Sequence, residues 1–332
     1  MSPRIAVLLP CYNEEAAIAQ TVAAFRAALP GADIYVYDNN SRDRTREVAA
    51  AAGAIVRSER MQGKGHVVRR MFADVEADIY VMADGDATYD AAAAPALVAR
   101  LAEERLDMVV GARQTEASGE GAAYRRGHVL GNRLFTGLLA RLFGHSFSDI
   151  FSGYRIFSRR FAKSFPALSA GFEIETEISV HALELAMPVD EIPTRYGARP
   201  EGSHSKLSTY RDGWRIMKTI LHLYRIERPT LFYGFFATFL AALAIILSIP
   251  LAITYVETGL VPRFPTAILA TGLMILAALC FFTGLILDTV VRGRREVRRL
   301  HYLSLPAVGS EAAGEQRDRR TEMPGDGMPR IP

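Results

Sequence analysis

Two long hydrophobic runs occupy the C-terminal part of the chain. Residues 230–256 and 264–287 contain no charged side chain. A bilayer core about 30 Å thick needs roughly 20 apolar residues in a helix, so each run is long enough to cross it. Buried helices of soluble proteins are seldom this long and rarely occur as a pair. The pattern therefore predicts two transmembrane helices, over 230–256 and 264–290.

The charges that flank these runs predict their orientation. Arg225 and Arg228 precede the first run, and a basic segment at 292–299 (RGRREVRR) follows the second. The short connection between the runs contains one Glu and one Arg. By the positive-inside rule, both basic flanks lie in the cytoplasm. We therefore expect a helical hairpin in a bacterial-type inner membrane, with the N-terminal domain and both termini in the cytoplasm.

The segment before the hairpin, residues 207–229, is expected to lie on the membrane surface. Within 210–228, basic side chains recur at spacings of three and four, and hydrophobic side chains fall on the opposite face. A surface helix of a soluble domain would look similar, but the position directly before a membrane span favours contact with anionic headgroups. Residues 306–332 are rich in Gly, Glu, Arg and Pro without periodicity, which predicts a disordered tail.

Residues 1–206 alternate between short apolar runs and longer helical patterns. This alternation predicts an α/β domain with a mostly parallel sheet and helices on both faces. Ligands of such sheets bind beyond the carboxyl ends of the strands. The expected strands are Ile5–Leu9, Ile34–Tyr37, Ala54–Val56, Ile79–Ala83 and Met108–Gly111, and the expected helices are Glu14–Leu29, Asp43–Ala52, Gly65–Val75 and Ala93–Glu104.

Composition narrows the class of function. Half of the 332 residues are hydrophobic, and the excess lies after residue 229. The net charge of +3 argues against nucleic acid as a partner, because domains that bind it are usually strongly basic. Cys11 and Cys280 are too far apart for a zinc motif or a disulfide framework, which suits a cytosolic domain. The N-terminal apolar stretch is too short for a signal peptide.

Polar, acidic segments follow three of the predicted strands, at residues 10–15 (PCYNEE), 38–45 (DNNSRDRT) and 83–90 (ADGDATYD). Because parallel strands end at the same edge of a sheet, we expect these segments to converge. Asp84 and Asp86 could simply form a turn. They could also hold a divalent cation, which takes hard oxygen ligands and leaves positions open for phosphate. The dinucleotide fingerprint and the P-loop are both missing from the sequence.

As a set, the segments VLLPCYNEE, YDNNSRDRT, GKG and DGDATYD resemble glycosyltransferase family 2, which has the Rossmann-like GT-A fold. Further along, GARQ, RRGHVLGNRL and DIFSGYRIFSRR resemble the branch that glycosylates polyprenyl phosphates, such as dolichol-phosphate mannose synthases and bacterial relatives with two C-terminal membrane helices. The processive branch of the family carries a Gln-x-x-Arg-Trp motif. Trp214, the single tryptophan, does not stand in such a motif, so that branch is set aside.

The resemblance implies inverting, metal-dependent transfer of a sugar from a UDP- or GDP-linked donor to polyprenyl phosphate at the cytoplasmic face of the membrane. Asp84 and Asp86 would hold Mg²⁺ or Mn²⁺, which neutralises the charge that builds on the leaving diphosphate. Relatives with paired membrane helices can form tetramers, so a homo-oligomer is possible. The implied nucleotide-sugar site consists of Pro10, Tyr12, Glu14, Asp38, Asn39, Lys64, Asp84 and Gly85.

Acceptor-side roles also follow from the resemblance. Asp149 matches the family's candidate base, and the implied catalytic residues are Asp149, Asp86 and Arg155. A phosphate monoester with a second pKa of about 6 is already mostly an anionic nucleophile at neutral pH. Asp149 is therefore expected to position the acceptor or stabilise the sugar ring. Arg113, Arg126 and Arg155 lie where the family binds the acceptor phosphate, a group that arginine holds with paired hydrogen bonds.

Two alternatives stay open. A family 2 enzyme with another membrane acceptor, such as a diacylglycerol, would need Asp149 as a base, because its acceptor is an alcohol. A catalytically idle scaffold would be expected to have a damaged metal motif, whereas the DGD segment is intact. DGDATYD departs from the DADLQ form common in the mannose enzymes, so the sequence predicts neither the sugar nor the nucleotide base.

Overall fold

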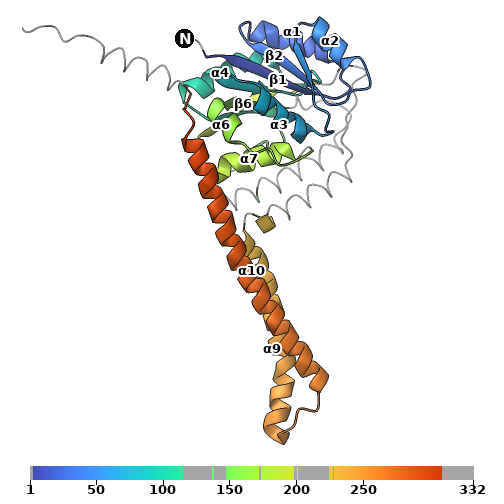
Figure 1. Ribbon diagram of the computed structural model, residues 1–332, viewed down its shortest axis with the longest axis vertical. Helices are drawn as coiled ribbons and strands as arrows, with labels where there is room; N and C mark the ends of the chain where they lie inside the picture. The colour runs from blue at the N-terminus through green and yellow to red at the C-terminus, as the bar shows by residue number, and fades with distance from the viewer. Residues whose placement is uncertain are drawn as a thin grey trace, which may run out of the picture. The chain divides into compact units, whose positions relative to one another are not determined.

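The computed structural model describes residues 3–114, 137, 147–171, 173–197, 200, 224–226 and 228–308 (Figure 1). The chain divides into two compact units. The first, here termed the sheet unit, contains the described residues up to 200 and from 298 onward. The second, the hairpin unit, contains the described residues between 224 and 297.

A seven-stranded mixed sheet forms the centre of the sheet unit, with the strand order β3-β2-β1-β4-β6-β5-β7. Neighbouring strands are parallel except where β6 pairs with β4 and β5, so β6 alone runs against the others in this sheet. The mostly parallel α/β fold predicted from the sequence is thus confirmed. The strands are β1 (Ile5–Cys11), β2 (Asp33–Asp38), β3 (Ile55–Ser58), β4 (Ile79–Met82), β5 (Met108–Gln114), β6 (Arg155–Ser158) and β7 (Val189–Arg195).

Helices cover both faces of the sheet, with α1 and α2 on one side and α3, α6 and α7 on the other (Figure 1). Alternate side chains of β1 enter opposite cores: Val7 and Leu9 join the core formed with α1 and α4, and Leu8 points away from it. Across the sheet, the Phe72 ring packs edge-on against Phe157 at 5.4 Å. The helices are α1 (Ile18–Ala28), α2 (Thr45–Ala51), α3 (Lys64–Asp74), the 3₁₀ turn η1 (Ala91–Ala93), α4 (Ala94–Glu103), α6 (Arg159–Ser164) and α7 (Ile174–Glu184).

The first two helices begin later than the sequence pattern predicts. Glu14 is expected to start a helix, but a turn precedes α1, in which the Glu14 carbonyl accepts from the amides of Ala17 and Ile18. Asp43 likewise lies before α2, where its carboxylate accepts from the Thr45 amide at 3.0 Å. A short polar side chain that bonds the following backbone in this way competes with the helix and shifts its start.

The hairpin unit contains two long helices, α9 (Pro229–Thr258) and α10 (Phe264–Leu303). By length and composition, both could span a membrane. Only 11% of the most apolar window of α9 and 17% of that of α10 is buried, whereas the core helix of a soluble protein would be mostly buried. α9 ends at Thr258 and is capped by Gly259, whose φ of 70° is the left-handed conformation that glycine adopts without strain. The predicted surface helix and C-terminal tail lie largely outside the described residues.

α10 continues well beyond its apolar part, and its last residues from Arg298 belong to the sheet unit. The Tyr302 hydroxyl donates to the Asp107 carboxylate at 2.6 Å, and the Arg298 guanidinium pairs with Glu184 at 2.7 Å. Both carboxylates are buried, so these contacts are part of the packing of the sheet unit. The sequence pattern predicted a basic membrane flank here and did not anticipate this packing.

Candidate active site

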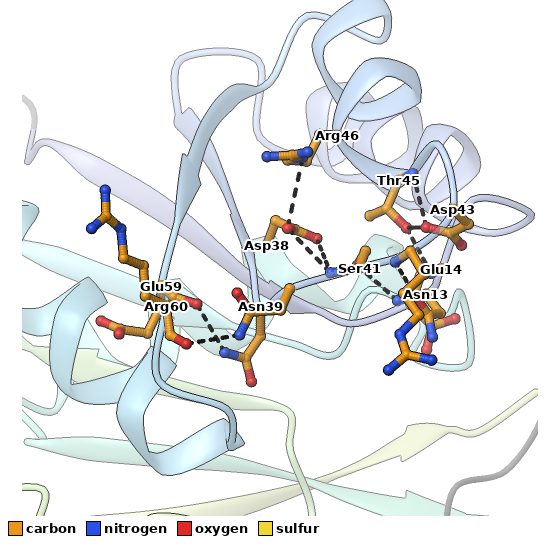
Figure 2. A network of polar contacts seen from close by, with 12 residues as sticks. Asn13, Glu14, Asp38, Asn39, Ser41, Asp43, Thr45, Arg46, Glu59 and Arg60 are labelled. Atoms are coloured by element: carbon orange, nitrogen blue, oxygen red, sulfur yellow. Dashed lines mark hydrogen bonds and ion pairs between the residues drawn. The ribbon is translucent and has the colours of Figure 1, made fainter.

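The segments that follow β1 and β2 contact each other, as expected for neighbouring parallel strands (Figure 2). The Asn13 amide donates to the Ser41 hydroxyl at 2.8 Å, and the Glu14 amide donates to the Thr45 hydroxyl at 2.9 Å. In the other direction, the Arg42 amide donates to the Asn13 side chain at 2.8 Å. Short polar side chains of each segment therefore accept hydrogen bonds from backbone amides of the other. These bonds hold both segments at one edge of the sheet.

Pro10, Tyr12 and Glu14, which were predicted to line the nucleotide, lie at this edge. Pro10 and Glu14 are buried and Tyr12 is partly exposed. Gly85 lies nearby at the end of β4, and a Cβ atom there would overlap the Cys11 sulfur. The predicted residues from two segments of the chain are thus close together.

Asp38, the last residue of β2, and Asn39, which follows it, have different environments (Figure 2). The Asp38 carboxylate is buried, accepts from the Ser41 amide at 3.3 Å and lies 3.8 Å from the Arg46 guanidinium. The Asn39 side chain accepts from the Gly63 amide at 2.7 Å and donates to the Met61 carbonyl at 2.8 Å. Both ends of the Asn39 amide are therefore engaged in holding the loop before α3.

The GKG segment begins α3 beneath another loop. Gly63 has a φ of 133°, and a Cβ atom there would overlap the Ala170 carbonyl oxygen. A Cβ atom at Gly65 would overlap the Ser169 carbonyl oxygen, and the Gly65 amide donates to the Ala170 carbonyl at 3.0 Å. Both glycines are required because residues 169 and 170 pass directly over the start of α3.

Lys64, between the two glycines, lies buried against two carboxylates. Its ammonium group contacts the Asp84 carboxylate and lies 2.6 Å from Oε1 of Glu175. Burial alone would lower the pKa of Lys64, but the charges of Asp84 and Glu175 outweigh it and raise that pKa. Glu175 was not predicted as a site residue, because an acidic side chain in the first turn of a helix is common for electrostatic reasons alone.

Asp84 and Asp86 stand directly after β4, where a divalent cation was predicted. Thr88 donates from its amide and its hydroxyl to Oδ1 of Asp86, at 3.2 and 2.6 Å, which orients this buried carboxylate. Among the described residues, no group of three or more His, Cys, Asp or Glu side chains could hold a metal. The residues fit Mg²⁺ or Mn²⁺ bound by one or two carboxylates, with phosphate and water as the remaining ligands.

Asp149 lies opposite Arg113, which extends from the end of β5. The Arg113 guanidinium donates from Nε to Oδ2 at 2.7 Å and from Nη2 to Oδ1 at 2.8 Å. Burial would raise the pKa of Asp149, but hydrogen bonds from Arg113 and its charge lower that pKa below the usual value. The guanidinium also lies 5.5 Å above the Tyr196 ring. Arg113 keeps 30% of its side chain exposed, so it can reach a ligand.

Arg155 does not fit its predicted role as a ligand of the acceptor phosphate. Its side chain is fully buried. The guanidinium donates to the carbonyls of Ile150 and Ser152 and to the Ser179 hydroxyl. Burial lowers its pKa to about 10. Arg155 therefore holds the 149–152 loop in place from below. Arg126, also predicted to bind the phosphate, lies outside the described residues.

Three comparisons with known proteins bear on this site. Residues 6–165 match the model of the family described as Glycosyl transferase family 2. The glycosyltransferase AglJ of Haloferax volcanii is 32% identical over 293 residues, which cover 88% of this chain and 95% of that relative. A dolichol-phosphate mannosyltransferase of Pyrococcus furiosus is 25% identical over 233 residues, covering 68% of this chain and 64% of that relative.

Among solved structures, the fold is similar to that of glucosyl-3-phosphoglycerate synthase from Mycobacterium tuberculosis. The structure of that enzyme in complex with Mn²⁺, UDP-glucose and phosphoglyceric acid has a TM-score of 0.53 and 24% sequence identity. The match covers 67% of this chain and 79% of the synthase. At this identity the likeness is one of fold.

Proposed function

Because the chain belongs to glycosyltransferase family 2, and so transfers a sugar from a nucleotide-sugar, we propose that its acceptor is a polyprenyl phosphate at the surface of a membrane. The observation that carries this proposal is the state of Asp149. Both of its oxygens bind Arg113 and its pKa is lowered, so it is a poor general base. An alcohol acceptor must lose a proton to a base, whereas a phosphate acceptor is already anionic at neutral pH.

On the donor side, we assign the diphosphate to the end of β4. Asp84 and Asp86 would hold Mg²⁺ or Mn²⁺, which neutralises charge on the departing nucleoside diphosphate when bound. Lys64 is a buried cation beside Asp84 and would contribute a second positive charge at the same place. Asp38 and the segment at 10–14 would bind the base and ribose. A solved structure of this fold holds Mn²⁺ together with UDP-glucose, which supports the assignment.

On the acceptor side, Arg113 would receive the lipid phosphate. Its guanidinium is fixed by the bidentate contact with Asp149 and is still partly exposed. Arginine fixed in this way binds a phosphate with directional, charge-assisted hydrogen bonds. Asp149 then positions Arg113, and direct attack by a phosphate oxygen would invert the configuration of the anomeric carbon.

A lipid acceptor is supported by the two apolar helices of the same chain. If α9 and α10 cross a bacterial inner membrane as a hairpin, the sheet unit stays on the cytoplasmic side, where nucleotide-sugars are available. The similarity to a dolichol-phosphate mannosyltransferase also supports this class of acceptor. The alternative acceptor, a diacylglycerol, would fit the same helices but would require Asp149 as a base.

The test is an assay of the full chain in detergent with a short polyprenyl phosphate, Mg²⁺ or Mn²⁺, and a panel of nucleotide-sugars. We expect one donor to give a sugar lipid that is extracted into organic solvent and whose mass equals that of the polyprenyl phosphate plus one sugar. Asp86→Asn should abolish the product, whereas Asp90→Asn should not, because an asparagine at 90 can still cap η1 as Asp90 does. Product with diacylglycerol and none with polyprenyl phosphate would establish the alternative.

A further inference from the structure

Glu175 has a buried carboxylate oxygen that the fold does not use. Its side chain is 6% exposed, and Oε1 contacts the Lys64 ammonium group at 2.6 Å. The second oxygen, Oε2, is shielded from solvent and receives no hydrogen bond from any described residue. Buried polar atoms in native proteins almost always have a partner, so an unpaired anionic oxygen calls for an explanation such as a ligand.

The position of Glu175 places this oxygen next to the assigned donor site. The Lys64 nitrogen contacts both Glu175 and Asp84, so these two carboxylates are neighbours around one ammonium group. The Arg155 guanidinium joins the helix that carries Glu175 to the loop that carries Asp149, because it donates both to the Ser179 hydroxyl of α7 and to the Ile150 carbonyl. Glu175 therefore lies beside the residues assigned to the donor diphosphate, on a helix that is also bonded to the acceptor-side loop. This position suits a contact with the transferred sugar.

The backbone around Glu175 is fixed independently of any ligand. The Glu177 carboxylate accepts from the amides of Leu168 and Ser169, at 2.8 and 2.7 Å. The same loop is bonded to the start of α3 by the Gly65 amide and the Ala170 carbonyl. An acceptor held this rigidly binds its partner at little cost in conformational entropy, which is a property of specificity-determining groups.

We propose that Glu175 determines the donor sugar, with Oε2 accepting a hydrogen bond from a hydroxyl of the transferred hexose. The proposal rests on the donor half of the proposed function and is independent of the identity of the acceptor. An ionised carboxylate accepts stronger hydrogen bonds than a neutral group. A site that is built to bind a hydroxyl discriminates strongly against an analogue without it, because the acceptor is then left unpaired.

The competing explanation is that Glu175 serves only to hold Lys64. The two roles differ in which ligand they affect. If Glu175 only positions Lys64, its loss weakens the binding of a nucleoside diphosphate and of the corresponding nucleotide-sugar alike. If Glu175 binds the sugar, its loss weakens only the nucleotide-sugar. Comparing the two ligands therefore separates the roles.

The experiment is calorimetric titration of the full chain in detergent, with Mn²⁺ present, using UDP against UDP-glucose and GDP against GDP-mannose. For the pair that binds, Glu175→Gln should weaken the nucleotide-sugar at least about tenfold and change the nucleoside diphosphate less than about twofold. Glu173→Gln, in the same stretch of chain, is the matched control and should change neither. Equal losses for both ligands, or no loss for either, would overturn the proposal.

A second measurement changes the ligand, by titrating donors that lack single hydroxyls of the sugar into wild type and into Glu175→Gln. For one of these donors, the missing hydroxyl should weaken binding to wild type. The loss should be about as large as the loss that Glu175→Gln causes for the complete donor. The variant should bind this same donor no worse than wild type does. Additive losses would contradict the contact. If the wild type bound neither nucleoside diphosphates nor nucleotide-sugars, the proposed function itself would fail.

Discussion

Arg113 binds both carboxylate oxygens of Asp149, through Nε at 2.7 Å and Nη2 at 2.8 Å. This pairing keeps Asp149 ionised and makes it a weak base. It also fixes the direction in which the Arg113 guanidinium points. The pair therefore suits an acceptor that arrives as an anion. Substituting Asp149 and Arg113 one at a time can separate the contribution of each residue to transfer.

Asp149→Asn should retain measurable transfer to polyprenyl phosphate, with kcat lowered by less than about 100-fold, because no proton has to be removed. Arg113→Lys should raise the KM for the lipid by at least about tenfold, since a lysine lacks the bidentate geometry, and should leave the KM for the donor within about twofold. Steady-state kinetics with each substrate varied in turn would measure both. A loss of more than about 1,000-fold in Asp149→Asn would indicate that Asp149 is a base after all.

Lys64 should compete with the metal for Asp84. In the structure its ammonium group contacts the Asp84 carboxylate that is proposed to bind the cation. Removing this charge in Lys64→Gln should tighten Mn²⁺ binding about tenfold in the absence of nucleotide, because repulsion between the two cations is lost. The same change should weaken binding of the nucleoside diphosphate. Calorimetric titration with Mn²⁺ alone provides the measurement, and an unchanged Mn²⁺ affinity would show that Lys64 and the metal do not share Asp84.

Gly65→Ala should destabilise the sheet unit by about 1–3 kcal/mol, because the new Cβ atom would overlap the Ser169 carbonyl and force the loop away from α3. Displacement of this loop would also move Glu175 and lower activity. Gly31→Ala is the matched control, since no atom lies within 4 Å of the Cβ it would add. Thermal unfolding in detergent would give the unfolding midpoints of both variants. Similar midpoints would indicate that the loop moves away from α3 without loss of stability.

His181 should make the fold sensitive to acid. Burial, with a smaller contribution from the charge of Arg298, lowers its pKa from 6.5 to about 3. The unfolded chain therefore binds a proton on His181 at a higher pH than the folded chain does. Stability from this residue is present above pH 6.5 and is lost as the pH falls towards 3, by a few kcal/mol at about pH 4.

His181→Gln removes the titrating group and should flatten this dependence. The variant is expected to be less stable than wild type at pH 7.5, because Gln packs less well between Phe161 and Phe165. Its unfolding midpoint should nevertheless fall less between pH 7 and 4.5 than that of wild type. Parallel pH profiles for the two proteins would contradict a lowered pKa of His181 in the folded chain.

Much of the fold could be predicted from the sequence because the signals were local. The apolar run of β4 followed by Asp84 and Asp86 identifies a buried strand with polar residues at its end. The reversed strand β6 was not predicted, because it is four residues long and its direction is set by pairing with β4 and β5. Direction of pairing has no local signature in so short a run.

The candidate site was predictable only where the ligand-binding signal was local. The requirement for Gly63 and Gly65 comes from a loop about a hundred residues further along the chain, so the sequence could indicate the motif but not its cause. For Arg155, the sequence motif predicted a phosphate ligand, whereas the structure buries the side chain. An arginine that satisfies buried carbonyls and one that receives a phosphate look the same in sequence, and only its complete burial separates them.

In the proposed reaction, a phosphate oxygen of a lipid attacks the anomeric carbon of the donor sugar. The most direct measurement compares a polyprenyl phosphate with the polyprenol of the same chain length, using the full chain, Mn²⁺ and the radiolabelled nucleotide-sugar that supports turnover. We expect label in the phosphate lipid and none in the polyprenol, with loss of the label in Asp86→Asn. Label in the polyprenol, or in a diacylglycerol in place of the phosphate lipid, would contradict it.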